Sequence, residues 1–160
     1  MKKFALLTLT LTAMLAFTAC GAEKKEDQAA QTVVETPAAT DVVVETVSET
    51  EKVAKLSDGE GTYTTTLTLE DGKAVNIAFD YINADGSSKY EAAKNGEYVM
   101  SETGMLWNEQ ADALATFLVE NEFDITKVTL DENGNTDAVT GVSIKVPEML
   151  ETAEALLESK

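Results

Sequence analysis

The chain has 160 residues, of which 29 are acidic and 12 are basic, so its formal net charge is -17. Every basic residue is a lysine, and the sequence contains no arginine and no histidine. This balance argues against nucleic-acid binding, which needs a basic face, and against docking on anionic lipid. Without histidine the chain lacks the commonest metal ligand and the usual general base. A single cysteine excludes an intrachain disulfide.

The N-terminus has the pattern of an export signal. Residues 1–3 include two lysines and so carry positive charge. Residues 4–17 form an apolar run that only threonines interrupt. A membrane-spanning helix needs about 20 apolar residues, so this run is too short to span a bilayer comfortably. The pattern therefore predicts a signal peptide over residues 1–19.

The residues before Cys20 resemble a lipobox, the cleavage site of bacterial lipoproteins, with Phe17 in place of the more usual leucine. This resemblance implies cleavage before Cys20, transfer of a diacylglyceryl group to its sulfur, and addition of fatty acid such as palmitate. We therefore expect a chain anchored by lipid to the extracytoplasmic face of the cell membrane. The alternative is a chance cysteine at the end of an ordinary signal peptide or an N-terminal membrane helix.

A polar segment follows the cysteine. Residues 21–57 contain no aromatic side chain, and the sequence Val-Val-Glu-Thr at 33–36 returns at 43–46. Two short copies bury no core, so the repeat is typical of a low-complexity linker. We predict lipidated Cys20 with a flexible acidic linker over residues 20–57, and one ordered domain over residues 58–160.

The domain opens with the pattern of a β-hairpin. Apolar and polar residues alternate over 63–69 and again over 75–81, and Asp71-Gly72 between them is a strong hairpin-turn signal. A loop is predicted over residues 83–88, followed by a short helical piece over 89–94 that Asn95-Gly96 closes.

The second half of the domain changes period. Residues 106–121 place Trp107, Ala111, Leu114 and Leu118 on one helical face. Residues 125–130 and 136–145 are predicted to be strands around a turn at 131–135. Pro147 is predicted to start a last helix. The sum is an α+β domain, a small, mainly antiparallel sheet covered by two main helices.

The stretch Asp137-Ala-Val-Thr-Gly-Val-Ser143 resembles the flavin-attachment motif of the FMN-binding domain family, which reads roughly Asp-x-x-(Ser/Thr)-Gly-Ala-(Thr/Ser). The chain from Asp58 onward is similar to small secreted FMN-binding lipoproteins, with a Thr-rich strand and the run Phe79-Asp-Tyr-Ile-Asn-Ala-Asp-Gly86. The resemblance implies the fold of that family and FMN held by a phosphoester that a separate flavin transferase makes. It also implies electron transfer outside the cytoplasmic membrane and no catalysis by the chain itself.

The resemblance assigns a role to four residues of the motif. Ser143 is the acceptor hydroxyl, Gly141 lets the backbone approach the phosphate closely, and Thr140 bonds the phosphate or shapes the turn. Asp137 is a recognition or turn-capping residue. The chain departs from the motif at two positions, where Val142 replaces the usual Ala and Ser143 the commoner Thr.

Composition adds an argument that is independent of the family. A reversible FMN site has to hold a dianionic phosphate, and this acidic chain has no arginine to hold it. A phosphoester retains the cofactor without a cationic clamp, so covalent attachment suits this chain better. The redox partner is not specified by the sequence, although an acidic surface favours a basic one.

Other functions have less support in the sequence. Asp131, Asn133, Asn135 and Asp137 alternate like calcium ligands, but the EF-hand glycine and glutamate positions hold other residues, so a solvated turn and no metal site are predicted. The motif Gly-x-Ser-x-Gly is absent, and no catalytic residue is predicted. The main alternative is a cofactor-free surface lipoprotein, acting as a binding module or as the precursor of a signalling peptide.

Overall fold

The computed structural model describes residues 41–159. The predicted signal peptide, Cys20 and the first half of the predicted linker lie outside the described residues. Within residues 41–159, no helix is both long enough and apolar enough to cross a membrane.

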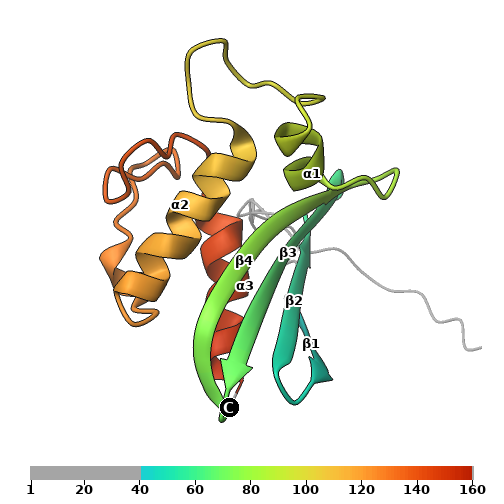
Figure 1. The fold of residues 1–160 in the computed structure, drawn as a ribbon, viewed down its shortest axis with the longest axis vertical. Coiled ribbons are helices and arrows are strands. Elements are labelled where there is room, and N and C mark those ends of the chain that lie inside the picture. Colours follow the sequence, from blue (N-terminus) through green and yellow to red (C-terminus); the bar gives the residue numbers. More distant parts are fainter. Residues whose placement is uncertain (1–40, 160) are drawn as a thin grey trace, which may run out of the picture. The chain divides into compact units, whose positions relative to one another are not determined.

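The described residues contain a four-stranded antiparallel sheet (Figure 1). The strands are β1 (Val43–Ser48), β2 (Glu51–Ser57), β3 (Gly61–Glu70) and β4 (Lys73–Asn83), in the order β1-β2-β3-β4. The predicted hairpin is present as β3 and β4, with Tyr63 opposite Tyr81 and Leu67 opposite Ile77. Its turn holds Asp71 at φ 50° and Gly72 at φ 75°, the left-handed pair that a two-residue hairpin turn requires.

The predicted boundary between linker and domain is wrong. Residues 43–57 were expected in the linker, but they form β1 and β2 and extend the sheet. Ala54 and Leu56 in β2 are 0% and 3% exposed, so this strand supplies part of the core. The second Val-Val-Glu-Thr copy is β1, whose Glu45 accepts a hydrogen bond from Lys55 of β2 at 2.8 Å. Valine-rich segments favour strands once a neighbouring strand is available, and the polar composition concealed that neighbour.

Two main helices cover the sheet, as predicted: α2 (Trp107–Glu120) and α3 (Pro147–Glu158). A short helix, α1 (Lys89–Lys94), lies between β4 and α2 in the chain. α3 packs on β2 and β3, and α2 packs on β4 and α1. A buried pair joins sheet to helix, because the Thr65 and Thr152 hydroxyls lie 2.6 Å apart. Core residues from both layers include Leu67, Ile77, Phe79, Leu114, Leu118, Met149 and Leu156. The α+β fold class is confirmed.

The two strands predicted after α2 are absent from the described structure. Residues Ile125–Lys127 form a 3₁₀ turn, in which the Asp124 carboxylate accepts the N–H of Thr126 at 3.1 Å. A single bridge between Leu130 and Thr136 is the remainder of the expected ladder. The segment from 136 to 146 is a loop whose buried side chains are those at 136, 139, 142, 144 and 146, and the alternation over 142–146 produced the strand-like pattern.

Candidate functional site: an exposed serine beside an aromatic cleft

The loop that carries the motif alternates between core and surface. Val139, Val142 and Ile144 are 7%, 7% and 6% exposed, whereas Thr140 and Ser143 are exposed. Val142, the residue that departs from the family motif, therefore packs into the core. Ser143 presents its hydroxyl on the surface, because neighbouring residues in this extended stretch face opposite ways.

A buried glutamine fixes the backbone at Ser143. Gln110 of α2 is 2% exposed, and its Oε1 accepts the N–H of Ser143 at 2.7 Å and the N–H of Ile144 at 3.0 Å. The Ser143 hydroxyl also reaches this oxygen, at 3.3 Å. The Gln110 amide nitrogen donates to the carbonyl of Met105 at 2.9 Å, so both ends of the side chain are used.

Sequence reasoning missed Gln110, although a signal was present. It lies three residues after Trp107 and four before Leu114, on the apolar face of α2. A polar residue on a buried helical face has to find a partner, since an unsatisfied buried amide costs about 1–3 kcal/mol. The partner turned out to be the motif loop, 33 residues away.

Gly141 is required by the backbone of the motif loop. Its φ is +84°, a left-handed conformation that residues with a side chain adopt with strain. A Cβ at this position would also collide with the sulfur of Met105. The turn is closed by a hydrogen bond of 3.2 Å from the Val142 N–H to the Val139 carbonyl. Gly141 therefore shapes the loop that carries Ser143.

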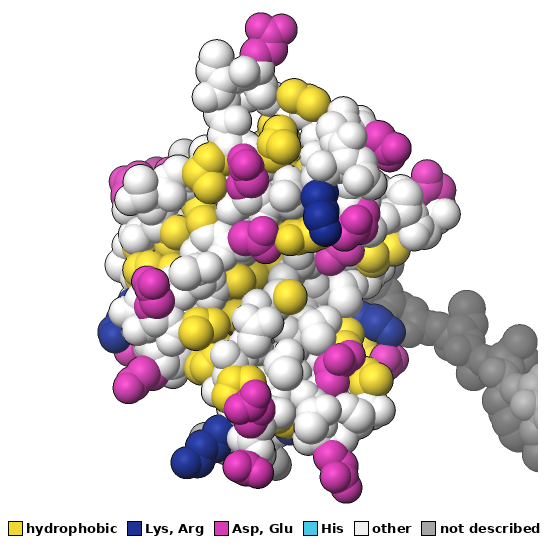
Figure 2. Space-filling model, in the orientation of Figure 1, with side chains coloured by type: hydrophobic (Ala, Val, Ile, Leu, Met, Phe, Trp, Pro, Cys, Tyr) yellow, Lys and Arg dark blue, Asp and Glu magenta, His cyan; other side chains and the backbone are white. Residues whose placement is uncertain are grey.

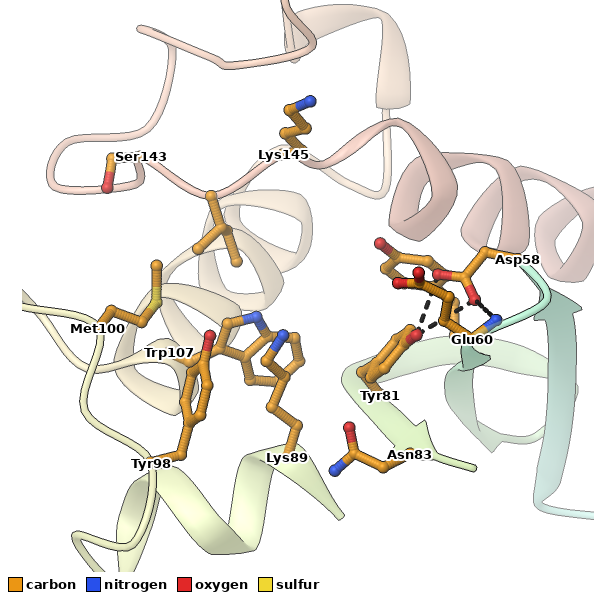
Figure 3. Close-up of a pocket in the computed structure, with 12 residues that line it drawn as sticks. Asp58, Glu60, Tyr81, Asn83, Lys89, Tyr98, Met100, Trp107, Ser143 and Lys145 are labelled. Atoms are coloured by element: carbon orange, nitrogen blue, oxygen red, sulfur yellow. Dashed lines mark hydrogen bonds between the residues drawn. The ribbon is translucent and has the colours of Figure 1, made fainter. Parts of the chain in front are cut away.

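Ser143 lies at a cleft of about 600 Å³, which Figure 3 shows in close-up. Of the four predicted motif residues, Ser143 lines the cleft, and Asp137, Thr140 and Gly141 are not among its lining residues. Asp137 borders a smaller hollow together with Asp131. The side of the cleft nearer Ser143 is formed by Lys89, Tyr98, Met100 and Trp107. The other side is formed by Asp58, Glu60 and Tyr81. Tyr63 also lines the cleft and packs against Tyr81.

The second side of the cleft is acidic and hydrogen-bonded. The Asp58 carboxylate accepts the Tyr81 hydroxyl at 3.0 Å and the N–H groups of Glu60 at 2.9 Å and Gly61 at 2.8 Å. Burial opposes ionisation of Asp58, but these hydrogen bonds to its charged form outweigh burial and lower its pKa. Gly61 leaves no room for a side chain, because a Cβ there would collide with the Tyr81 ring and the Ile82 carbonyl.

Two tyrosine rings meet at this acidic side. Tyr63 and Tyr81 pack edge to face, with centroids 4.9 Å apart and planes inclined by 71°. Burial, assisted by the negative charges of Glu148 and Asp58, raises the pKa of Tyr63 to about 12. The ring is therefore neutral at physiological pH.

The first side of the cleft holds a lysine among aromatic rings. The Lys89 Nζ lies 4.9 Å from the ring centroid of Tyr98, 5.1 Å from that of Tyr81 and 5.7 Å from that of Trp107. These distances are within the range of cation–π attraction. Lys145 also lines the cleft, but its side chain is exposed.

These residues fit FMN. An exposed hydroxyl borders a cleft whose volume falls in the range of small-molecule sites, roughly 300–1,000 Å³, and aromatic side chains line it as they line most such sites. The attachment point needs no cationic clamp, and the motif loop has none close by except Lys145. Ser143 would hold the phosphate, and the rings of Tyr98 and Trp107 border the space for the flavin.

The turn weighed as a calcium loop is internally bonded. Asp131 accepts the N–H groups of Asn135 at 2.9 Å and Asn133 at 2.8 Å, and these bonds lower its pKa. Across residues 41–159, no group of three or more acidic or cysteine side chains is placed to hold a metal ion.

No protein-family model matches the chain, and no curated protein matches it. The chain is similar to a protein from Clostridium thermocellum whose structure was solved by NMR in solution, with 30% sequence identity and a TM-score of 0.49. The similarity covers 68% of this chain and 88% of that one. It carries no information about function.

Proposed function

We propose that this protein is a lipid-anchored extracytoplasmic flavoprotein that carries FMN as a phosphoester on Ser143 and serves in electron transfer. The observation that carries the proposal is the position of Ser143, an exposed hydroxyl at the edge of an aromatic cleft of about 600 Å³. FMN attached to Ser143 has the cleft beside it, so its flavin ring can lie among the side chains that line the cleft.

The motif's departure at Val142 is compatible with modification. A valine beside an acceptor serine would obstruct a modifying enzyme if both side chains faced outward. Val142 is 7% exposed and packs in the core, so it leaves the exposed side of the loop open. Gln110 holds the backbone on the inner side of the same loop, which keeps Ser143 presented to solvent.

Ester formation needs help from a second protein. The Oγ of Ser143 loses its proton and forms a bond to the phosphorus of FMN. In the same step the donor nucleotide, which carries this phosphorus, loses the bond from it to the leaving group. The Ser143 hydroxyl has the Gln110 amide oxygen as its neighbour, which is not a base. A flavin transferase therefore has to supply the base that accepts the hydroxyl proton.

The charge of the chain bears on its partners. Bound FMN would supply reversible electron uptake, and the residues of the cleft would orient it and limit its contact with water. Figure 2 shows acidic side chains spread over the pictured face with few lysines among them. Such a surface favours basic redox partners, and it predicts association rates that fall with ionic strength.

The test is to produce the chain together with a flavin transferase, denature it, and look for flavin fluorescence in the gel. Intact mass then reports whether FMN has been added. Ser143→Ala is expected to abolish both signals. Thr103→Ala removes an exposed hydroxyl that lies outside the motif and does not line the cleft, and it is expected to retain them.

The same experiment separates the two main functions. A wild-type band without fluorescence, whose mass shows no added FMN, would contradict the proposal and leave the cofactor-free lipoprotein as the better reading. The anchor is tested independently, because labelling of cells with a tagged fatty acid is expected to mark the wild type and not Cys20→Ser.

A further inference from the structure

Lys89 is held in the cleft by the local structure around it. It is the first residue of α1, directly after the N-cap Ser88, whose Oγ accepts the N–H of Glu91 at 3.0 Å. The Ser88 hydroxyl donates to Asp80 of β4 at 2.7 Å, and Asp80 also accepts the N–H of Tyr90 at 3.0 Å. These bonds tie the start of α1 to the sheet, so the base of the Lys89 side chain has a fixed position.

The ammonium group of Lys89 has aromatic neighbours in place of an acidic partner. Its Nζ lies between 4.9 and 5.7 Å from the ring centroids of Tyr98, Tyr81 and Trp107 (Figure 3). Within residues 41–159 salt bridges involve Lys55 and Lys94, and Lys89 shares the lack of one with the other lysines there. Lys89 differs from those lysines in having three aromatic rings around its Nζ. In a chain with 29 acidic residues, the cleft beside Ser143 therefore contains a cation that no carboxylate of the described residues pairs with directly.

We propose that Lys89 sets the reduction potential of the flavin by stabilising negative charge on its ring. This inference rests on the proposed function, and it gives a role to a residue of the cleft that lies outside the attachment motif. The oxidised ring is neutral, and uptake of two electrons and one proton leaves the reduced ring with one negative charge. The electrons come from a reduced donor, which is dithionite in the experiment below.

The physical reason is that a nearby positive charge favours the negatively charged state of the ring. Coulomb attraction in a partly desolvated cleft is several times stronger than in bulk water, and charge close to a flavin is one of the ways in which proteins tune it. Asp58 and Glu60 oppose this effect from the other side of the cleft. Lys145 is exposed, so solvent and salt screen its charge more effectively.

The experiment compares midpoint potentials of the flavin-bearing protein during reductive titration with dithionite and indicator dyes. Lys89→Met keeps the stem of the side chain and removes its charge, Lys89→Gln is a second neutral variant, and Lys89→Arg restores the charge. Lys145→Met is the matched control, because it removes the other cleft lysine. Urea unfolding establishes that each variant is folded.

Both neutral Lys89 variants are expected to lower the equilibrium constant for reduction about tenfold, a shift of about 30 mV for a two-electron couple. Lys89→Arg should stay near the wild type, and Lys145→Met should shift the potential less than Lys89→Met does. Unchanged potentials in the folded neutral variants, or an equal shift in Lys145→Met, would overturn the inference. Intact mass separates this failure from failure of the proposed function, in which the wild type carries no FMN.

Discussion

The side-chain oxygen of Gln110 accepts a hydrogen bond of 2.7 Å from the backbone N–H of Ser143. The same oxygen accepts the N–H of Ile144, so one buried residue of α2 fixes the backbone of the motif loop at Ser143 and Ile144. The hydroxyl that the motif predicts as the acceptor thus depends on a residue that the motif does not contain.

Gln110→Leu tests this dependence. The substitution leaves the N–H groups of Ser143 and Ile144 without their acceptor, and it is expected to destabilise the protein by about 1–3 kcal/mol. Amide hydrogen exchange at these two residues should accelerate, and the yield of attached flavin should fall. Unaltered exchange in Gln110→Leu would show that the loop holds its shape without the glutamine.

Val142→Ala restores the alanine of the family motif. Because the Val142 side chain is 7% exposed and lies in the core, its truncation is expected to cost about 2 kcal/mol of unfolding free energy. The yield of attached flavin should not change, since Ser143 faces the other way. Urea unfolding and in-gel flavin fluorescence measure the two quantities separately. A gain in fluorescence without loss of stability would mean that the valine obstructs the transferase.

The raised pKa of Tyr63, about 12, predicts a loss of stability at alkaline pH. Between pH 10 and pH 12 the tyrosine ionises in the unfolded state and stays protonated in the folded state. Ionisation therefore stabilises the unfolded state relative to the folded one, and the unfolding free energy falls. Below pH 10 both states are protonated, and the contribution is fully present. Tyr63→Phe should therefore show a smaller fall over this window in urea unfolding.

The corrected domain boundary predicts how the chain can be shortened. A fragment of residues 41–160 is expected to unfold cooperatively in urea, because it retains all four strands. A fragment of residues 58–160 lacks β2, which contributes the buried side chains of Ala54 and Leu56, and it exposes the edge of β3. Circular dichroism should show this shorter fragment unfolded or aggregated. Equal midpoints for the two fragments would restore the boundary predicted from sequence.

Elements with strong local signals were predicted correctly. The β3–β4 hairpin follows from Asp71-Gly72 between alternating strands, since turn chemistry and register are properties of adjacent residues. The helices α2 and α3 follow from their apolar periodicity, and Pro147 marks the first position of α3 as expected. Each of these signals lies within about one element of chain, where propensity and pattern agree.

Elements that depend on distant neighbours were not predicted. β1 and β2 form because β3 offers an edge and α3 packs on β2, and neither partner is visible in the polar sequence of residues 43–57. The loop after residue 136 repeats the apolar alternation of a strand, but it packs against the core without a ladder. In both places the spacing of apolar residues reflects which side chains are buried. Burial alone does not specify which backbone hydrogen bonds form.

The sequence by itself singled out Ser143, through the resemblance of its loop to an attachment motif, because residue identity and spacing are local properties. The tertiary structure decided what surrounds that hydroxyl. It brought Gln110 beneath the loop, turned Val142 into the core, and gathered Asp58, Lys89 and Trp107 around one cleft. These residues come from elements far apart in the chain, so folding alone puts their charges and rings within reach of one another.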